Sequence, residues 1–160
     1  MKTIIKSPCK CSNQELESFE ALIRIGGEVA ADGLTARIRN AAFLTFLSLD
    51  DGLLIGVSAL KRPNPGYRAK VFKNAHSKLR PEDFSLELGW IFVVESERGK
   101  KFSHDLVERL LPYANSERIY ATIREHNKPM KLTNEHYGFQ REGSAYLSDD
   151  EEYKLLLYIR

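Results

Sequence analysis

Two apolar segments joined by a short acidic turn constrain the fold of this 160-residue chain more than any other feature. Residues 43–49 and 53–60 are rich in apolar side chains, and Asp50-Asp51-Gly52 between them is a strong hairpin signal. The two segments are therefore expected to pair as antiparallel strands. Any fold of this chain must include a sheet.

The remaining elements follow from hydrophobic periodicity and from residues that start and stop helices. Ser12, with Glu15 three residues later, predicts the start of a helix that weakens or ends at Gly26-Gly27. Further helices are expected at 30–39, 66–75 and 128–137, and further strands at 3–6, 84–94, 119–123, 143–147 and 153–159. This order predicts one mixed sheet with helices on its faces.

The most informative segment is a long apolar strand followed by a charged loop and an amphipathic helix. Arg98-Gly99-Lys100-Lys101 lies in the loop, and Ser103 is expected to cap the helix. The helix carries one apolar stripe, formed by Leu106, Val107, Leu110, Leu111 and Ala114. Backbone amides at such a helix start suit a phosphate or pyrophosphate, although an ordinary solvated basic turn explains the spacing equally well. Walker and G-x-G-x-x-G motifs are absent from the sequence.

Composition and charge limit the function classes. Hydrophobic residues make up 42% and charged residues 29%, which is typical of one globular domain over residues 1–160. The net charge of +2 is too small for nucleic-acid binding by bulk charge, and the basic run at 61–80 is expected to be a solvated helix face. No apolar stretch reaches the roughly 20 residues of a membrane span, and a signal peptide is not evident, so a cytoplasmic protein is expected. Cys9, Cys11 and the four histidines lack metal-ligand spacing, so no metal site is expected.

The segment Ile91-Phe-Val-Val-Glu-Ser-Glu-Arg98-Gly-Lys-Lys-Phe-Ser103 combines a strand end, a charged loop and a helix start. The segment 123–139 contains an asparagine after a strand and a helix that ends in Gly-Phe. These two segments resemble the GNAT superfamily of acyl-CoA-dependent N-acetyltransferases, and the first is similar to the R/Q-x-x-G-x-G/A motif of that family. The resemblance implies an α/β (α+β) fold, a single GNAT-like domain with a mixed, mostly antiparallel central sheet flanked by helices.

The resemblance also implies acetyl-CoA as co-substrate. Its pyrophosphate would contact the loop and helix start at Arg98, Gly99, Lys100, Lys101, Phe102 and Ser103. Its pantetheine arm would pair with the backbone of Phe92, Val93 and Val94, and Asn127 and Asn134 would also contact it. Lys101 stands where the family has a small residue, and Asn134 stands where many members have the tyrosine that protonates the leaving thiolate.

Glu87 and Tyr137 are the candidate catalytic residues. A carboxylate on the central strand can take the proton of an attacking amine, so Glu87 is the candidate base, although a hydrogen-bonded sheet residue is the alternative. Tyr137 is the candidate acid in place of Asn134. The expected reaction is direct acetyl transfer from acetyl-CoA to an amine whose identity stays open. The alternatives are a GNAT-like acyl-CoA-binding or regulatory protein and a nucleic-acid-binding module, and the sequence leaves open whether the chain forms a homodimer.

Overall fold

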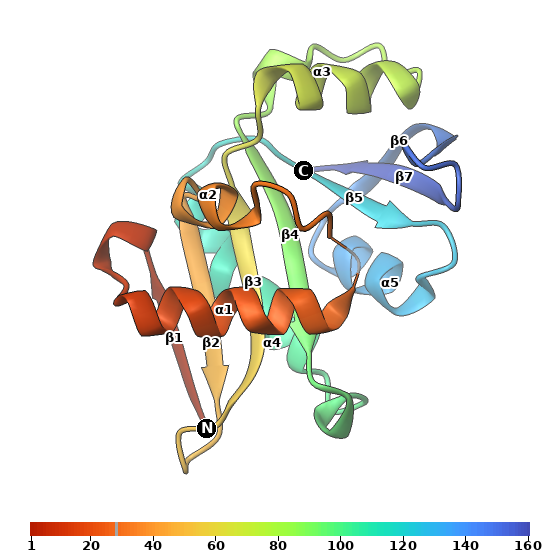
Figure 1. The fold of residues 1–160 in the computed structure, drawn as a ribbon. Coiled ribbons are helices and arrows are strands. Elements are labelled where there is room, and N and C mark those ends of the chain that lie inside the picture. The colour runs from red at the N-terminus through yellow and green to blue at the C-terminus, as the bar shows by residue number, and fades with distance from the viewer. Residues whose placement is uncertain (28) are drawn as a thin grey trace. The chain divides into compact units, whose positions relative to one another are not determined.

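The computed structural model describes residues 1–27 and 29–160, and its strands form a mixed seven-stranded sheet (Figure 1). The strands are β1 (Lys2–Lys6), β2 (Phe43–Ser48), β3 (Leu54–Lys61), β4 (Leu86–Val93), β5 (Ile119–Arg124), β6 (Gln140–Leu147) and β7 (Lys154–Ile159). Their order in the sheet is β1-β2-β3-β4-β5-β7-β6. β4 and β5 are parallel, whereas β1–β2, β2–β3, β5–β7 and β6–β7 are antiparallel. The predicted mixed, mostly antiparallel sheet is confirmed.

Five α-helices accompany these strands in the described part of the chain. They are α1 (Asn13–Gly26), α2 (Leu34–Arg39), α3 (Pro65–Asn74), α4 (Phe102–Leu110) and α5 (Lys128–His136). The chain divides into two compact units. The first unit contains Met1–Arg62 and Leu88–Asn115, and the second contains Pro63–Glu87 and Ser116–Arg160.

The predicted hairpin forms part of the sheet in the first unit. β2 and β3 pair antiparallel, and the turn between them places Gly52 at a φ of 90°, which glycine adopts without strain. The Asp51 carboxylate accepts a hydrogen bond from the Leu53 amide at 3.0 Å, which fixes the turn. The turn chemistry read from the sequence is therefore the chemistry that closes the hairpin.

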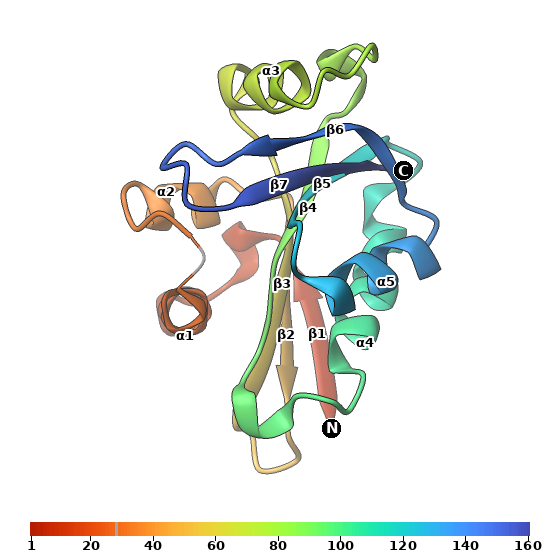
Figure 2. The same cartoon turned by 90° about the vertical axis from the view of Figure 1, so that its right-hand side faces the viewer.

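Helices cover both faces of the strands β1, β2 and β3. α1 lies on one face and α4 on the other (Figure 2). Phe19 of α1 packs into a core with Phe46 and Trp90, whereas Leu106 of α4 packs with Leu47 on the opposite face. The apolar stripe predicted for the helix after the charged loop is buried as expected, with Leu106, Val107, Leu110, Leu111 and Ala114 all in the core.

α1 begins and ends where its sequence predicts. The Ser12 hydroxyl accepts from the Glu15 amide at 3.1 Å, and the Glu15 carboxylate accepts from the Ser12 amide at 2.8 Å. At the other end Gly27 adopts a left-handed φ of 66°. Both helix signals are confirmed.

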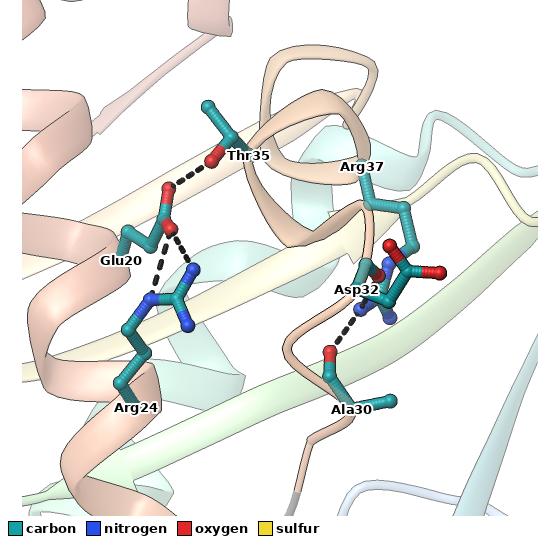
Figure 3. Close-up of polar contacts among 6 residues, drawn as sticks. All are labelled: Glu20, Arg24, Ala30, Asp32, Thr35 and Arg37. Atoms are coloured by element: carbon teal, nitrogen blue, oxygen red, sulfur yellow. Dashed lines mark hydrogen bonds and ion pairs between the residues drawn. The ribbon is translucent and has the colours of Figure 1, made fainter.

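A polar contact connects α1 with α2 (Figure 3). The Thr35 hydroxyl donates to the Glu20 carboxylate at 2.7 Å, and the Arg24 guanidinium donates to the same carboxylate from one turn along α1. These two donors lower the pKa of Glu20 below its ordinary value, the Thr35 hydrogen bond being the larger cause. The carboxylate thus holds the two helices together through a charged hydrogen bond.

The helix predicted over 30–39 is wrong in its first turn, because α2 begins at Leu34. The Arg37 guanidinium donates to the backbone carbonyl of Asp32 at 3.1 Å and also to that of Ala30 (Figure 3). A helix would commit these carbonyls to amides further along the chain. Here a side chain satisfies them, and the segment before Leu34 turns.

In the second unit, α3 and α5 lie on opposite faces of β5, β7 and β6 (Figures 1 and 2). Phe72 of α3 packs against Phe84, Tyr120 and Leu157. The helix predicted at 66–75 is confirmed, and the strands predicted at 119–123, 143–147 and 153–159 correspond to β5, β6 and β7. β6 starts three residues earlier than expected, at Gln140.

Candidate active site

The residue expected to act as a base is buried in the second unit and surrounded by hydroxyl groups. β4 pairs with β5 so that Glu87 lies opposite Tyr120, and opposed residues share one face of a sheet. The Tyr120 hydroxyl donates to the Glu87 carboxylate at 3.3 Å, Tyr67 of α3 donates at 3.4 Å, and Thr122 donates at 3.5 Å. Glu87 itself is 2% exposed. Three side chains from two further elements therefore converge on one carboxylate.

The phenols in this cluster remain protonated. Burial, and then the negative charge of Glu87, raise the pKa of Tyr67, Tyr120 and Tyr146 well above the ordinary value. A phenol with so high a pKa donates a hydrogen bond and does not act as a base by itself. The carboxylate of Glu87 is accordingly the group in this cluster suited to accept a proton.

Sequence reasoning found Glu87 but missed Tyr67, Tyr120 and Thr122. Tyr120 and Thr122 are two positions apart in β5, so strand periodicity predicts that they share a face of the sheet. Strand periodicity does not predict that β5 lies beside β4. Tyr67 carried one signal, since it stands in the first turn of a helix that a proline begins.

The predicted cofactor arm site lies at the end of β4 in the first unit, and its backbone groups already have partners. The Val94 amide donates to the Ile55 carbonyl at 2.9 Å across the β3–β4 pair. The Val93 carbonyl accepts from Nε of Arg98 at 3.1 Å, and the Arg98 guanidinium lies 5.7 Å from the centre of the Phe92 ring. Arg98 thus folds back over the strand. A ligand that pairs with the Val93 carbonyl must displace the Arg98 side chain from it.

The loop before α4 presents backbone amides. Gly99 and Lys101 have left-handed φ values of 80° and 63°, and Lys100 pairs with Glu97 at 2.8 Å. Across residues 1–27 and 29–160, no backbone carbonyl accepts from the amides of residues 99–103. Consecutive unpaired amides at a helix start suit an anion.

The expected role of Ser103 as helix cap is wrong. α4 starts at Phe102, so Ser103 is the second residue of the helix, and Lys101 occupies the capping position without a side-chain hydrogen bond. The left-handed backbone at Lys101 turns the chain into the helix two residues earlier than a cap at Ser103 would. The amide of Ser103 keeps its place at the helix start.

Asn127 and Asn134 hold α5 in the second unit. The Asn127 side-chain oxygen accepts from the Met130 amide at 3.1 Å and caps the helix. The Asn134 side chain is 1% exposed, and its amide donates to the Met130 carbonyl at 2.9 Å. Tyr137 follows the helix, half-buried, with its ring 4.8 Å from that of His136. Asn127 therefore has a structural role, whereas the buried side-chain oxygen of Asn134 has no hydrogen-bond partner among the described residues, and the contact of both with a cofactor stays a prediction.

The predicted site residues thus fall into two groups. Glu87, Asn127, Asn134 and Tyr137 belong to the second unit, and the others, from Phe92 to Ser103, belong to the first. Among the residues that the structure describes, no three His, Cys, Asp or Glu side chains gather as a metal site. Within the same residues, no helix is long and apolar enough to cross a membrane.

Comparison with known proteins identifies the fold. No model of a protein family matches the sequence, and no curated protein is significantly similar to it. An acyl-CoA N-acyltransferase from Pseudomonas aeruginosa superposes with a TM-score of 0.73 at 16% identity, covering 99% of this chain and 98% of that one. A GNAT-family acetyltransferase from Listeria monocytogenes gives 0.66 at 13% identity, with 99% and 94% covered. A ribosomal-protein-alanine N-acetyltransferase from Brucella melitensis gives 0.65 at 17% identity, with 98% of each chain covered.

These likenesses extend over nearly the whole chain at low sequence identity. This protein has the fold of the GNAT N-acetyltransferases, as its two motif-like segments predicted.

Proposed function

We propose that this chain is an acetyl-CoA-dependent N-acetyltransferase, acting as one domain over residues 1–160. The observation that carries the proposal is the buried Glu87 carboxylate, which accepts hydrogen bonds from three hydroxyl groups in a chain of GNAT fold. A neutral amine that attacks a thioester must lose a proton from its nitrogen as the amide forms. Glu87 is the group that would take this proton.

The loop before α4 fits the charged end of acetyl-CoA. The amides of residues 99–103 face no backbone acceptor in the described part of the chain, and nothing beyond its chain neighbours lies within 4 Å of the position that a Cβ on Gly99 would take. Arg98, Lys100 and Lys101 are exposed and add positive charge beside these amides. Acetyl-CoA would supply an acetyl group activated as a thioester. Phe92, Val93 and Val94 would hold its pantetheine arm, with Arg98 leaving the Val93 carbonyl on binding.

The second half of the reaction needs a proton for the leaving thiolate. Asn134 cannot supply it, because an amide is not an acid and its N–H is committed to the Met130 carbonyl. Tyr137 is the phenol nearest in sequence, and we assign it the role of acid. A catalytically weakened, GNAT-like acyl-CoA-binding or regulatory protein is the alternative that Asn134 and Lys101 favour.

A mass-spectrometric screen with labelled acetyl-CoA tests the activity directly. The acceptors are a primary alkylamine, a polyamine, an aminoglycoside and a peptide with a free N-terminus, and transfer of the label to at least one is expected. If the label stays on coenzyme A with every acceptor while acetyl-CoA still raises the unfolding temperature, the protein binds acyl-CoA without catalysing transfer. Because acetyl-CoA is a cytoplasmic metabolite, we also propose that the protein acts in the cytoplasm.

Replacement of Glu87 tests its role. Glu87→Gln should lower kcat by about 10² to 10⁴ and leave acetyl-CoA affinity unchanged. Glu142→Gln is the matched control, since Glu142 also accepts a hydroxyl hydrogen bond, from Ser77 at 2.8 Å, in the same unit. If the Glu87→Gln variant is as active as the Glu142→Gln variant, Glu87 is only a structural residue of the sheet.

A further inference from the structure

The burial of Glu87 raises the question of how an amine in solvent delivers its proton. The carboxylate belongs to a residue that is 2% exposed. Three residues donate a hydroxyl hydrogen bond to this carboxylate. Tyr120 is fully buried and Thr122 is half-buried. Tyr67 is 43% exposed, and its hydroxyl lies 3.4 Å from Oε1 of Glu87. Of the three residues that donate to Glu87, Tyr67 is thus the most exposed.

The local sequence fixes Tyr67 in this position. The Asn64 side chain accepts from the Gly66 amide at 2.8 Å and from the Tyr67 amide at 3.4 Å, which caps the first turn of α3. The neighbouring Arg68 donates to the Phe84 carbonyl at 3.0 Å, two residues before β4 begins. α3 is therefore attached both at its own start and to the segment that leads into the strand of Glu87.

We propose that Tyr67 relays the proton of the acceptor amine to Glu87, an inference that rests on the proposed acetyl transfer. As the amine nitrogen bonds to the acetyl carbon and the carbon–sulfur bond breaks, the nitrogen passes its proton to the Tyr67 oxygen. The hydroxyl proton of Tyr67 moves at the same time to Oε1 of Glu87. The amide and Tyr67 end neutral, Glu87 ends protonated, and the sulfur of coenzyme A leaves as the thiolate, which takes its proton from Tyr137, the acid assigned above.

The acidity of Tyr67 suits a relay. Its hydroxyl donates to the Glu87 carboxylate, and the partial burial of Tyr67 together with this negative charge raises the pKa of Tyr67 far above the ordinary value, so the phenol does not persist as an anion. The side chain can therefore gain one proton only while it loses another. Tyr120 has the same hydrogen bond to Glu87 but no exposed surface, so it can support the charge of the carboxylate without meeting the amine.

This difference provides the matched pair of variants. Tyr67→Phe and Tyr120→Phe each remove one hydroxyl from Glu87, and both are assayed with acetyl-CoA and the acceptor that the screen identifies. Tyr67→Phe should lower kcat/KM for the amine by about 10² or more, the usual size of a lost proton-transfer group, and Tyr120→Phe by less than tenfold. Tyr67→His, which can also pass a proton, should retain more activity than Tyr67→Phe. The KM for acetyl-CoA and the unfolding temperature are measured for all three variants.

A proton inventory separates a relay from a structural role. In mixtures of light and heavy water, the wild-type rate should depend on the square of the deuterium fraction, because two protons move together. Tyr67→Phe should give a linear dependence and Tyr120→Phe should keep the curved one. Equal losses in the two Phe variants, or a linear inventory in the wild type, would overturn the relay while the acetyl transfer stands. A wild-type protein that acetylates no amine would overturn the proposed function, and the relay with it.

Discussion

Adding a methyl group at Gly143 should lower the free energy of unfolding, because a Cβ atom there would collide with a backbone carbonyl. Gly143 lies in β6 at a φ of +65°, and a Cβ atom there would stand 2.0 Å from the Ala75 carbonyl oxygen at the end of α3. The following amide, of Ser144, donates to that same oxygen at 2.7 Å. The strand therefore contacts the helix end through bare backbone, and no side chain fits between them.

The cost of Gly143→Ala is the sum of two effects. A left-handed conformation costs an alanine about 1 to 2 kcal/mol. The Cβ must move about 1 Å to reach even 3.0 Å from the oxygen, which breaks the Ser144 hydrogen bond at a further cost of about 0.5 to 1.5 kcal/mol. The loss of about 1.5 to 3.5 kcal/mol should lower the unfolding temperature by roughly 3 to 14 °C in a chain of this size.

Chemical denaturation of Gly143→Ala beside Gly52→Ala measures the effect. Gly52 has a φ of +90°, but nothing lies within 4 Å of the position that its Cβ would take, so only the conformational cost of about 1 to 2 kcal/mol is expected. The difference between the two variants reports the collision with Ala75. Equal losses in the two would refute the reasoning. Because α3 also carries Tyr67, Gly143→Ala should in addition lower turnover.

Three further predictions concern the loop, the asparagine and alkaline pH. Replacing Arg98 and Lys100 together with Ala should weaken acetyl-CoA binding by about 1 to 3 kcal/mol, as lost charge-assisted contacts do, and unchanged affinity by calorimetry would remove them from the phosphate site. Asn134→Tyr should lower the unfolding temperature, since the position is 1% exposed and bonded to Met130; a stable and more active variant would contradict this. Burial raises the pKa of Tyr158 to about 12, so stability from this group is complete below pH 10 and is lost as the pH rises toward 12. Tyr158→Phe should flatten this alkaline loss in denaturation curves.

Local chemistry made much of the fold predictable. The capping box at Ser12, the left-handed Gly27 and the acidic turn at Gly52 each involve residues within four positions of one another, so the sequence alone contains both partners. The predicted starts of two helices, α2 and α4, were wrong because each depends on a feature that residue type does not reveal. The start of α2 depends on Arg37 reaching back to Asp32, and the start of α4 depends on a left-handed Lys101, and neither follows from helix propensity.

The candidate site was predictable only in part, because its members come from separate elements. Glu87 stood out as a carboxylate in an apolar strand. Its partners Tyr67 and Tyr120 lie 20 and 33 positions away in the sequence. Tyr120 contacts Glu87 because β5 pairs with β4, and Tyr67 contacts it because α3 packs over that face of the sheet. Strand order decides this contact, and hydrophobic periodicity carries no information about strand order.

Asn134 stands where the GNAT resemblance implies a tyrosine that protonates the leaving thiolate, and the cost of losing that acid in the proposed reaction can be calculated. The Asn134 amide donates to the Met130 carbonyl and the residue is 1% exposed, so a larger phenol at this position would have to displace its neighbours. If no group protonates the leaving thiolate, the reaction must release a thiolate whose pKa lies near 8.5, and at pH 7 this costs about 2 kcal/mol. That penalty slows transfer about thirtyfold and disappears as the pH approaches 8.5. If Glu87 is the base that we propose, the loss of this acid should therefore cost less activity than the loss of Glu87, for which a factor of about 10² to 10⁴ is expected.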